Sequence, residues 1–227
     1  MSIEIKNFYS KLKFPGVYTM DDILFYDSVI CNDYLKFYNE SVFECNTVLD
    51  VGCGSGFIVN FLAHRHKNIQ FTAIDFGDGI DFAESFSKEN NITNITYHKV
   101  DLLNYTPLSK YDLVFCNGVL HHIPDQTNAI SRLKAYANDK IMLGVYNSYG
   151  KLAKKIFPVK YVNSVLYSDQ EECPFELAYT DRQLRDMFNE YNVDKVFPSL
   201  SGKLVNLKNV FNYQNGGLTL YLLSKTV

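Results

Sequence analysis

The sequence lacks any apolar run near the ~20 residues that a membrane span requires, and it lacks an excess of positive charge. Its 22 Lys and Arg residues stand against 25 Asp and Glu residues, which gives a formal net charge of −3. No global positive field therefore draws in nucleic acid. Residues 1–20 also lack the apolar centre of a secretory signal peptide. We therefore expect a cytoplasmic protein with neither a membrane nor a nucleic acid as partner.

Cysteine and metal-ligand patterns are equally sparse. The five cysteines are odd in number and scattered, and no two form a C-x-x-C motif, which argues against a disulfide framework and a zinc ribbon. His64 and His66 have H-x-H spacing, but they fall in the last turn of an expected helix without carboxylate or cysteine partners nearby in the sequence. We therefore expect no metal site. The motifs G-x-x-x-x-G-K-S/T and G-x-S-x-G are absent too, so phosphoryl transfer and serine hydrolysis lack their usual machinery.

The composition is that of a folded chain. Hydrophobic residues make up 47% of the 227 residues and charged residues 21%, which is enough apolar material for a core. The length favours one domain with insertions. We divide residues 1–227 into a helical N-terminal cap (1–45), a cofactor-binding core (46–146), a lid insertion (147–178) and a C-terminal part with a helix and the last strands (179–227).

From residue 46 onward, short β-rich runs alternate with helical segments. The expected strands are Thr47–Val51, Ile69–Ile74, Ile95–His98, Asp112–Cys116 and Lys140–Val145, and the expected helices are 57–66, 79–90 and 126–137. Apolar runs that are bounded by turns and separated by helices are typical of a parallel sheet with crossover helices. The fold class is therefore predicted to be α/β and doubly wound.

The N-terminal cap carries its own helix signals. Thr19 is followed by Asp22 in a spacing that resembles a capping box. Beyond it, apolar residues recur at spacings of three and four, which predicts one amphipathic helix with a buried stripe. These residues are Ile23, Tyr26, Ile30, Tyr34, Phe37 and Tyr38.

The C-terminal part carries a similar signal. Thr180 and Gln183 form another capping-box pattern, which predicts the start of a helix. After this helix we expect two strands, Val193–Phe197 and Leu218–Leu223. Segments 147–178 and 199–217 carry no clear element and are expected to be long loops, which are usually functional or mobile.

The sharpest motif follows the first expected strand. Residues 48–56 read Val-Leu-Asp-Val-Gly-Cys-Gly-Ser-Gly, so a buried-type strand runs into three alternate glycines and then into a helix. Glycine lets backbone come close to a ligand, and ligands of open α/β sheets bind at the carboxyl ends of the strands. Asp50, Gly52, Gly54 and Gly56 are therefore candidates for ligand binding. A tight strand-to-helix turn without a ligand would produce the same glycines.

Acids stand at the ends of the next two expected strands. Asp75 follows the second strand, nineteen residues after Gly56, near the ~20-residue offset at which an acid reaches ribose hydroxyls in nucleoside-binding folds. Asp101 follows the third strand. Asp75 could instead serve as a turn residue or helix N-cap, although Asp78 is better placed to cap the next helix. Glycine or aspartate signals at three strand ends predict a nucleoside site at one edge of the sheet.

A dinucleotide-dependent dehydrogenase is the obvious competitor for such a site. Its fingerprint is G-x-G-x-x-G, in which the third glycine lets the helix pack closely against the strand. Here Phe57 occupies that position, and the spacing is G-x-G-x-G. The dehydrogenase is therefore the weaker alternative.

The sequence resembles the class I S-adenosylmethionine-dependent methyltransferases. The match consists of the Asp50–Gly56 loop, Asp75 as the ribose acid, Asp101-Leu102 at the adenine, and the Phe115–Asp125 segment after the fourth strand. Order and spacing agree across residues 46–146, and outside that core the resemblance is weak. The resemblance implies a Rossmann-like, mostly parallel seven-stranded sheet with helices on both faces and an antiparallel last strand. It also implies a substrate lid built from the N-terminal helices and the segment after the fifth strand.

The same resemblance assigns roles around S-adenosyl-L-methionine and its product S-adenosyl-L-homocysteine. It implies that Gly52 and Gly54 offer backbone to the methionine end and that Asp50 braces the loop. Asp75 would accept hydrogen bonds from both ribose hydroxyls, and Asp101 from the adenine amine. The other expected cofactor contacts are Gly56 in the loop, Phe76 and Leu102 on the adenine faces, Asn117 after the fourth strand, and Tyr18, which with Tyr9 would close over the cofactor from the N-terminal cap.

The paired histidines after the fourth strand are the catalytic candidates. The methyl group of a sulfonium is already activated, so an enzyme mainly holds a nucleophile in line and excludes water. An oxygen or nitrogen nucleophile that carries a proton also benefits from a base, and His121 and His122 lie beside the expected methyl group. Capping, packing and lining of the substrate wall are the alternatives for these rings.

The acceptor is expected to be a small molecule. Nucleic-acid amino methyltransferases of this fold carry Asn or Asp followed by Pro-Pro and an aromatic residue, whereas residues 117–120 here are Asn-Gly-Val-Leu. In the lid insertion, tyrosines are interleaved with lysines such as Lys154 and Lys155, which either form a solvated face or recognise an anionic group. RNA or protein methylation and a noncatalytic cofactor-binding module remain alternatives. The oligomeric state does not follow from the sequence.

Overall fold

The computed structural model describes residues 4, 7, 8, 16–28, 33–148, 175–197 and 218–226. Tyr9, Lys154 and Lys155 lie outside the described residues, as do most of the expected lid insertion and the whole of segment 199–217. The division of the chain into cap, core, lid and C-terminal part therefore stays a prediction.

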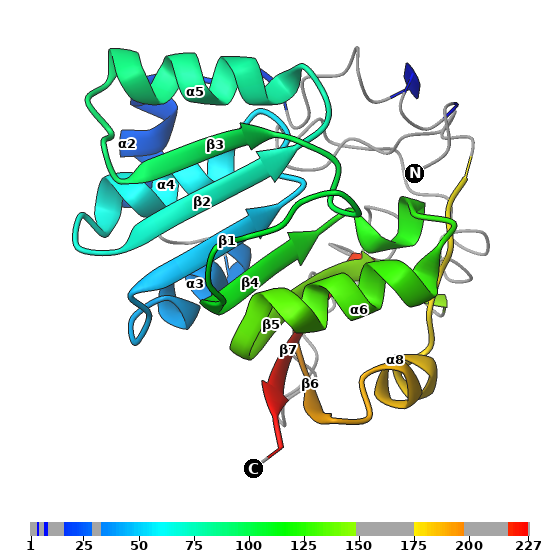
Figure 1. The fold of residues 1–227 in the computed structure, drawn as a ribbon. Helices are drawn as coiled ribbons and strands as arrows, with labels where there is room; N and C mark the ends of the chain where they lie inside the picture. Colours follow the sequence, from blue (N-terminus) through cyan, green and yellow to red (C-terminus); the bar gives the residue numbers. More distant parts are fainter. Residues whose placement is uncertain are drawn as a thin grey trace, which may run out of the picture.

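The centre of the described structure is a seven-stranded sheet with the order β3-β2-β1-β4-β5-β7-β6 (Figure 1). Strands β1 to β5 are parallel, and β7 runs antiparallel to both of its neighbours. The strands are β1 Thr47–Val51, β2 Gln70–Asp75, β3 Ile95–Lys99, β4 Tyr111–Asn117, β5 Ala137–Tyr146, β6 Tyr191–Phe197 and β7 Leu218–Lys225. The predicted α/β, doubly wound sheet with an antiparallel last strand is confirmed.

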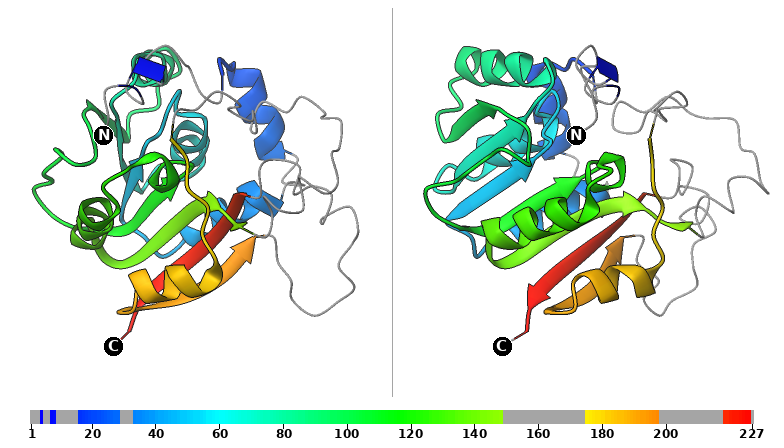
Figure 2. Two further views of the ribbon diagram at one scale, coloured as in Figure 1. Left: turned by 90° about the vertical axis from the view of Figure 1, so that its right-hand side faces the viewer. Right: turned by 45° about the vertical axis from the view of Figure 1, so that its right-hand side comes forward.

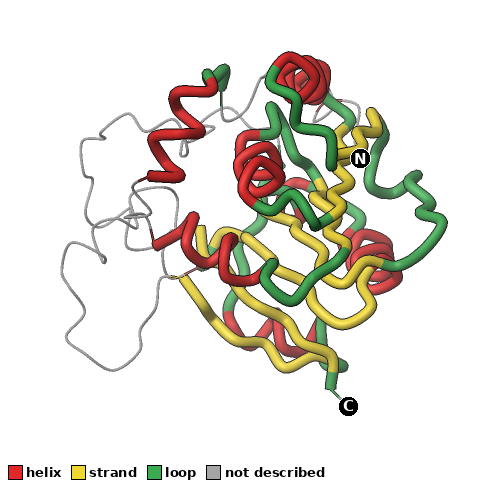
Figure 3. The backbone as a smooth tube through the Cα atoms, turned by 90° about the vertical axis from the view of Figure 1, so that its left-hand side faces the viewer, coloured by secondary structure: helices red, strands yellow, loops and turns green. Residues whose placement is uncertain are grey.

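Helices cover both faces of this sheet (Figure 3). They are α2 Met20–Ser28, α3 Asp33–Ser41, α4 Phe57–Arg65, α5 Gly79–Glu89, α6 Gln126–Tyr136 and α8 Asp181–Met187, with a short 3₁₀ helix, η1, at Leu120–His122. No helix among the described residues has the length and apolar character of a membrane span.

Successive residues of each strand face opposite layers of the core, because side chains alternate along a strand. Leu49 of β1 packs in one apolar cluster with Leu133 of α6 and Leu184 of α8. Its neighbour Val48 packs in the other cluster with Phe61 of α4, and that cluster also includes side chains of α2, α3 and α5. Figure 2 shows α6 and α8 together on one side of the sheet. Burial on both faces explains why these strands read as continuous apolar runs.

Both expected N-caps form. The backbone N–H of Thr19 donates to Asp22 Oδ2 at 2.8 Å, and the N–H of Asp22 donates back to Thr19 Oγ1 at 3.3 Å. The Thr180 hydroxyl and the Gln183 side chain form a complete capping box at the start of α8. The single amphipathic helix expected after Thr19 corresponds to α2 and α3, and residues 29–32 between them lie outside the described part.

The expected boundaries differ most at β5. The sequence predicts a strand from Lys140 to Val145, whereas β5 runs from Ala137 to Tyr146. The first residues of this strand include the exposed Asn138 and Asp139, which give no hydrophobic signal. Backbone pairing of Ala137 with Tyr111 of β4 sets the start of the strand instead.

The parallel arrangement brings the carboxyl ends of β1 to β5 to one edge of the sheet (Figure 1). The glycine loop follows β1, Asp75 ends β2, Asp101 follows β3 and Asn117 ends β4. Residues that are far apart in the sequence therefore meet at this edge, as expected for ligand sites of open α/β sheets.

Candidate active site

The glycine loop between β1 and α4 depends on backbone that only glycine adopts without strain. Gly52, Gly54 and Gly56 have φ angles of 76°, 57° and 77°, in the left-handed region that disfavours residues with a Cβ. A Cβ on Gly52 would also stand 2.1 Å from a methyl carbon of Val119, and one on Gly56 would stand 2.5 Å from the Cβ of Ala83. The glycines are thus required both by the positive φ angles of the loop and by its close packing against Val119 and Ala83.

Asp75 joins this loop to the end of β2. Its Oδ2 accepts the backbone N–H of Gly54 at 2.8 Å, and its Oδ1 accepts the N–H of Gly77 at 2.7 Å. Burial raises the pKa of the Asp75 carboxyl above its ordinary value, and these two hydrogen bonds offset only part of the effect. A carboxylate has about four acceptor positions, so it can hold the turn and still accept from a ligand.

Asp75 and Asp78 are the two candidates for the turn and the helix N-cap that follow β2. Asp75 is a turn residue, because it bonds the N–H of Gly77 two positions on. Asp78 is at the N-cap of α5, as expected, but its side chain makes no capping hydrogen bond. It instead accepts from the ammonium group of Lys99 at 2.8 Å.

Asp50 is a buried acid of the site, with 7% of its surface exposed. Burial, and secondarily the charge of Asp75, raise the pKa of the Asp50 carboxyl to about 7. Within the described part of the chain we find no hydrogen bond to this carboxylate, so the predicted bracing of the loop has no hydrogen-bond counterpart there. A carboxyl of this kind is readily ionised by a nearby positive charge.

Asp101 lies in a tight turn after β3. Its Oδ1 accepts the N–H of Leu103 at 3.0 Å, and its own carbonyl accepts the N–H of Asn104 at 2.8 Å. The hydroxyl of Tyr136 lies 2.7 Å from the carbonyl oxygen of Leu102 and 2.8 Å from that of Tyr105. The end of α6 therefore supports this turn through a long-range contact that no sequence pattern signals.

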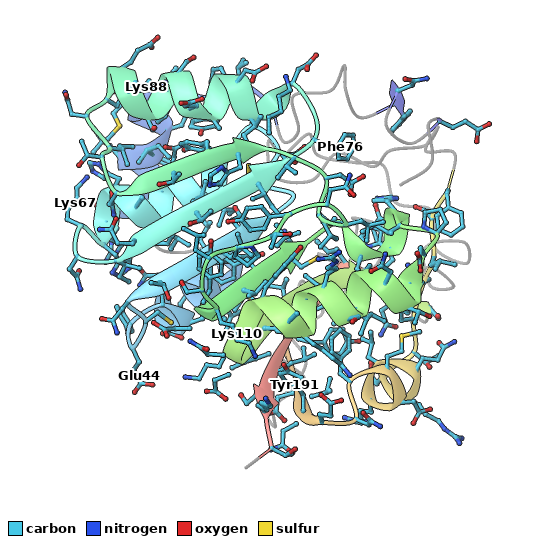
Figure 4. All side chains as sticks on the ribbon, viewed as in Figure 1. Glu44, Lys67, Phe76, Lys88, Lys110 and Tyr191 are labelled. Atoms are coloured by element: carbon cyan, nitrogen blue, oxygen red, sulfur yellow. The ribbon has the colours of Figure 1, made fainter. Side chains whose placement is uncertain are left out.

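The two residues expected on the adenine faces differ in exposure. Leu102 is buried within the apolar cluster on the α6 side of the sheet. Phe76 is half-buried, and Figure 4 shows it beyond the arrowhead of β2, at the edge where the parallel strands end. Phe76 is therefore the better placed of the two for stacking on a planar ligand.

Asn117 is the last residue of β4 and pairs with Gly144 of β5, which has no side chain. A Cβ on Gly144 would stand 1.8 Å from Asn117 Oδ1, so the side-chain amide lies directly on the backbone of Gly144. The adjacent N–H of Gly118 donates to the carbonyl oxygen of Gly144 at 2.9 Å. The missing Cβ of Gly144 thus leaves the space that the amide of Asn117 occupies.

The two histidines form the last part of η1, and both are buried, with 1% of His121 and 5% of His122 exposed. The ring of His121 lies 4.0 Å from the ring of Tyr146, with an interplanar angle of 34°, and 4.2 Å from the ring of His122. Nδ1 of His122 lies 3.0 Å from the carbonyl oxygen of Phe175. Because a carbonyl can only accept, Nδ1 of His122 is the donor in this contact.

Tyr18 contacts the glycine loop from the face of the sheet that α4 and α5 cover. Its hydroxyl donates to the carbonyl oxygen of Ser55 at 2.9 Å and accepts from Asn60 Nδ2 at 2.8 Å. Its ring centroid lies 5.1 Å from that of Phe57 and 4.6 Å from that of Phe86. This position supports the loop backbone, and direct contact between Tyr18 and a cofactor stays a prediction.

The described residues contain no group of three His, Cys, Asp or Glu side chains arranged to hold a metal ion. His66 instead lies with Nε2 2.8 Å from Asn39 Oδ1. The site is therefore built from a glycine loop, buried acids, an amide and two histidines. A doubly wound sheet with these groups at its carboxyl edge is the arrangement expected of the class I methyltransferases that the sequence resembles.

Comparison with known proteins assigns the family. A family model described as a methyltransferase domain matches residues 43–195, more than half of the chain. The chain therefore belongs to the methyltransferase domain family. The prediction of a methyltransferase domain is confirmed.

Two curated relatives match shorter stretches. The (S)-coclaurine N-methyltransferase of Papaver somniferum is 24% identical over 131 residues, which are 57% of this chain and 37% of that protein. A ubiquinone biosynthesis O-methyltransferase of Hydrogenovibrio crunogenus is 32% identical over 89 residues, 38% of this chain and 36% of that protein. The chain thus spans about a third of the length of these relatives.

Solved structures share the fold over much more of the chain. A magnesium protoporphyrin IX methyltransferase from Synechocystis PCC 6803, solved with bound SAH, has a TM-score of 0.63 at 14% identity over 98% of both chains. A 1,6-didemethyltoxoflavin-N1-methyltransferase from Burkholderia thailandensis has a TM-score of 0.58 at 14% identity, over 90% of this chain and 81% of that chain. At such low identity the likeness shows the fold alone.

Proposed function

We propose that this protein binds S-adenosylmethionine at the carboxyl edge of the sheet and transfers its methyl group to an oxygen or nitrogen atom of a small molecule. The observation that carries the proposal is the hydrogen bond between Asp75 and the N–H of Gly54, which joins the ribose acid to the glycine loop. The relatives support it by name, because they are O- and N-methyltransferases of small molecules.

The residues at this edge fit the cofactor. Gly52 and Gly54 leave half-buried backbone without side chains, on which an amino-acid moiety can lie. Asp75 keeps acceptor positions for a ribose diol. Asp50, whose pKa is raised to about 7 by burial and then by Asp75, favours a positively charged neighbour that would ionise it. The bound cofactor would supply an activated methyl group on a positively charged sulfur.

His122 is the stronger of the two base candidates. Its Nδ1–H donates to the carbonyl of Phe175, and such a bond holds the ring in the orientation and tautomer that a general base acting through Nε2 would use. His121 lies against the ring of Tyr146, an arrangement that favours a wall of the site. The chain's own contribution is then to orient the acceptor, exclude water and receive its proton.

The finer identity of the acceptor stays a prediction from sequence. An anionic group on the acceptor rests on Lys154 and Lys155, which lie outside the described residues. The cytoplasmic location and the absence of nucleic-acid and membrane partners also rest on composition alone. The chain spans only part of its curated relatives, so their substrates are no more than a guide.

Ligand binding and methyl transfer test the proposal in sequence. Calorimetric titration with S-adenosylmethionine, S-adenosylhomocysteine and the nicotinamide dinucleotide NAD is expected to give binding of the first two only. At 100 times its dissociation constant, a ligand raises the free energy of unfolding by about 2.7 kcal/mol, so a thermal melt gives an independent reading. Transfer of labelled methyl to a panel of small phenols and amines then tests catalysis. Failure of S-adenosylhomocysteine to bind would overturn the proposal, and binding without transfer would favour a noncatalytic module.

A further inference from the structure

Residues 175–180, here called the strap, cross the turn that carries the two histidines. The N–H of Leu177 donates to the carbonyl oxygen of His121 at 2.8 Å, and Phe175 accepts from His122 Nδ1 at 3.0 Å. Farther along, the N–H of Tyr179 donates to the carbonyl oxygen of Tyr146 at 2.8 Å. The strap is thus bonded to both η1 and the end of β5.

One side-chain amide, that of Gln126, adds a further connection between the strap and η1. Nε2 of Gln126, the first residue of α6, donates to the carbonyl oxygen of Leu120 at 2.9 Å and also to that of Ile123. Oε1 of the same amide accepts from the hydroxyl of Tyr179 at 2.6 Å. The two carbonyls can only accept and the hydroxyl must donate, so this amide has one orientation. Leu120 and Ile123 flank the two histidines, and the amide therefore spans the histidine turn from end to end.

This network is not needed to start α6. The side chain of Asp125 already caps that helix, with Oδ1 accepting the N–H of Asn128 at 3.1 Å. Tyr179 is buried, and burial raises the pKa of its hydroxyl above the ordinary value, so the hydroxyl remains a donor across the neutral range. A buried polar network is unfavourable unless every member has a hydrogen-bond partner. Here two hydrogen bonds join the Gln126 amide to the histidine turn, and the third joins it to the hydroxyl of Tyr179.

We infer that Gln126 and Tyr179 are positioning residues, which hold η1 and the strap together so that the Nδ1–H of His122 stays bonded to the carbonyl of Phe175. This inference rests on the proposed function, because it concerns the candidate base of the same reaction. The two residues act through the backbone of Leu120 and Ile123 and touch neither cofactor nor acceptor in this role.

Three variants separate this role from a merely structural one. Tyr179→Phe keeps the ring and removes only the donor to Gln126, and Gln126→Met keeps the length of the side chain and removes the whole amide. Tyr221→Phe is the matched control, because the Tyr221 hydroxyl is also buried, donates to Asp181 Oδ1 at 2.6 Å and accepts from Asn147 Nδ2 at 3.0 Å, and neither contact involves η1 or Gln126.

The decisive readout is the tautomer of His122 in long-range ¹H–¹⁵N spectra of the ligand-free protein, assigned with a His122→Gln variant among the five histidines. The wild type and Tyr221→Phe are expected to hold His122 in the Nδ1–H form. In Tyr179→Phe and Gln126→Met, the population of the other tautomer is expected to rise at least severalfold. A His122 spectrum in both variants identical to that of the control would overturn the inference.

Cofactor binding and turnover complete the test. Affinity for S-adenosylhomocysteine is expected to stay within about twofold of the wild type in all three variants. For the best acceptor of the phenol and amine panel, kcat is expected to fall about tenfold in Tyr179→Phe with KM nearly unchanged, and to stay at the wild-type value in the control. Failure of S-adenosylhomocysteine to bind the wild type would count against the proposed function. The tautomer measurement needs no ligand, so it tests the positioning role separately.

Discussion

The hydroxyl of Tyr136 at the end of α6 donates to the carbonyl oxygen of Leu102 at 2.7 Å, in the turn that carries Asp101. The ring is buried, with 2% of its surface exposed, and the same hydroxyl lies 2.8 Å from the carbonyl oxygen of Tyr105. A helix on one face of the sheet therefore sets the position of a turn at its carboxyl edge.

Tyr136→Phe is expected to loosen this turn without emptying the core. The ring stays, and loss of a buried hydrogen bond that leaves its carbonyl partners unpaired destabilises a protein by about 1–2 kcal/mol. Affinity for S-adenosylhomocysteine is expected to fall several-fold, because Asp101 loses its fixed position. Denaturant unfolding and calorimetry measure the two effects. A stability loss with unchanged affinity would restrict Tyr136 to a structural role.

Asp75→Ala is expected to weaken binding of S-adenosylmethionine at least tenfold. A hydrogen bond to a charged acceptor contributes about 1.5–3 kcal/mol, and this carboxylate also holds the N–H of Gly54. Asp78→Ala is the matched control, since Asp78 lies three residues away and its bond to Lys99 is at the exposed surface. Titration calorimetry on both variants gives the comparison, and equal affinities would contradict the ribose assignment.

Gly144→Ala is expected to displace the amide of Asn117. The new Cβ would stand 1.8 Å from Asn117 Oδ1 and 3.0 Å from a methyl carbon of Leu220, so the amide has to move. Such overpacking destabilises a core by about 1–3 kcal/mol. Binding of S-adenosylhomocysteine or turnover should fall several-fold if Asn117 lines the site.

Gly118→Ala provides the control for this change. A Cβ there meets nothing within 4 Å, although its φ of 76° still makes alanine unfavourable by about 1–2 kcal/mol. Both variants therefore lose stability, and only Gly144→Ala also moves the amide. Equal affinity and turnover in the two variants would show that the position of Asn117 is unimportant.

The stability of the ligand-free protein is expected to depend on pH through Asp50. Its pKa is raised to about 7 by burial and by Asp75, against about 3.9 in an unfolded chain. The folded protein therefore binds this proton more tightly, so the contribution to stability is complete below about pH 4 and is lost as the pH rises through about 7. Asp50→Asn, which cannot ionise, is expected to be more stable than the wild type by about 2–4 kcal/mol at pH 8 and by much less at pH 4.

Unfolding curves at several pH values check this expectation, and a difference that does not grow with pH would refute it. Binding gives a second reading. A positively charged ligand lowers the pKa of a neighbouring carboxyl. The wild type is therefore expected to release a proton when S-adenosylmethionine binds near pH 7, and Asp50→Asn to release less. Titrations in buffers of different ionisation enthalpy measure that proton.

The sequence predicts best where local chemistry decides the structure. Thr47–Val51 is a strand with the expected bounds, and the glycine loop follows it, because apolar runs and alternate glycines have direct local meaning. The reciprocal Thr180 and Gln183 cap is confirmed for the same reason. Tyr18 illustrates the opposite case, since an aromatic residue before a helix does not reveal which side of a loop it will contact.

The missed residues act across long stretches of chain. Gln126 and Tyr179 lie 53 positions apart, and Tyr136 lies 34 positions from Leu102, so neither contact produces a periodic pattern or a motif. Gln126 reads only as the first residue of a helix. The start of β5 gives no hydrophobic signal, because Asn138 and Asp139 are exposed polar residues and only the pairing of Ala137 with Tyr111 extends the strand. Such contacts are consequences of the assembled fold.

The contact between Tyr18 and the carbonyl oxygen of Ser55 has a practical consequence for handling this protein. The match to the family model begins at residue 43, so a fragment trimmed to that boundary would omit the phenol ring that packs against Phe57 and Phe86. Asn60 would lose a buried partner in the same cut. A fragment that keeps this support of the glycine loop therefore has to start upstream of Tyr18.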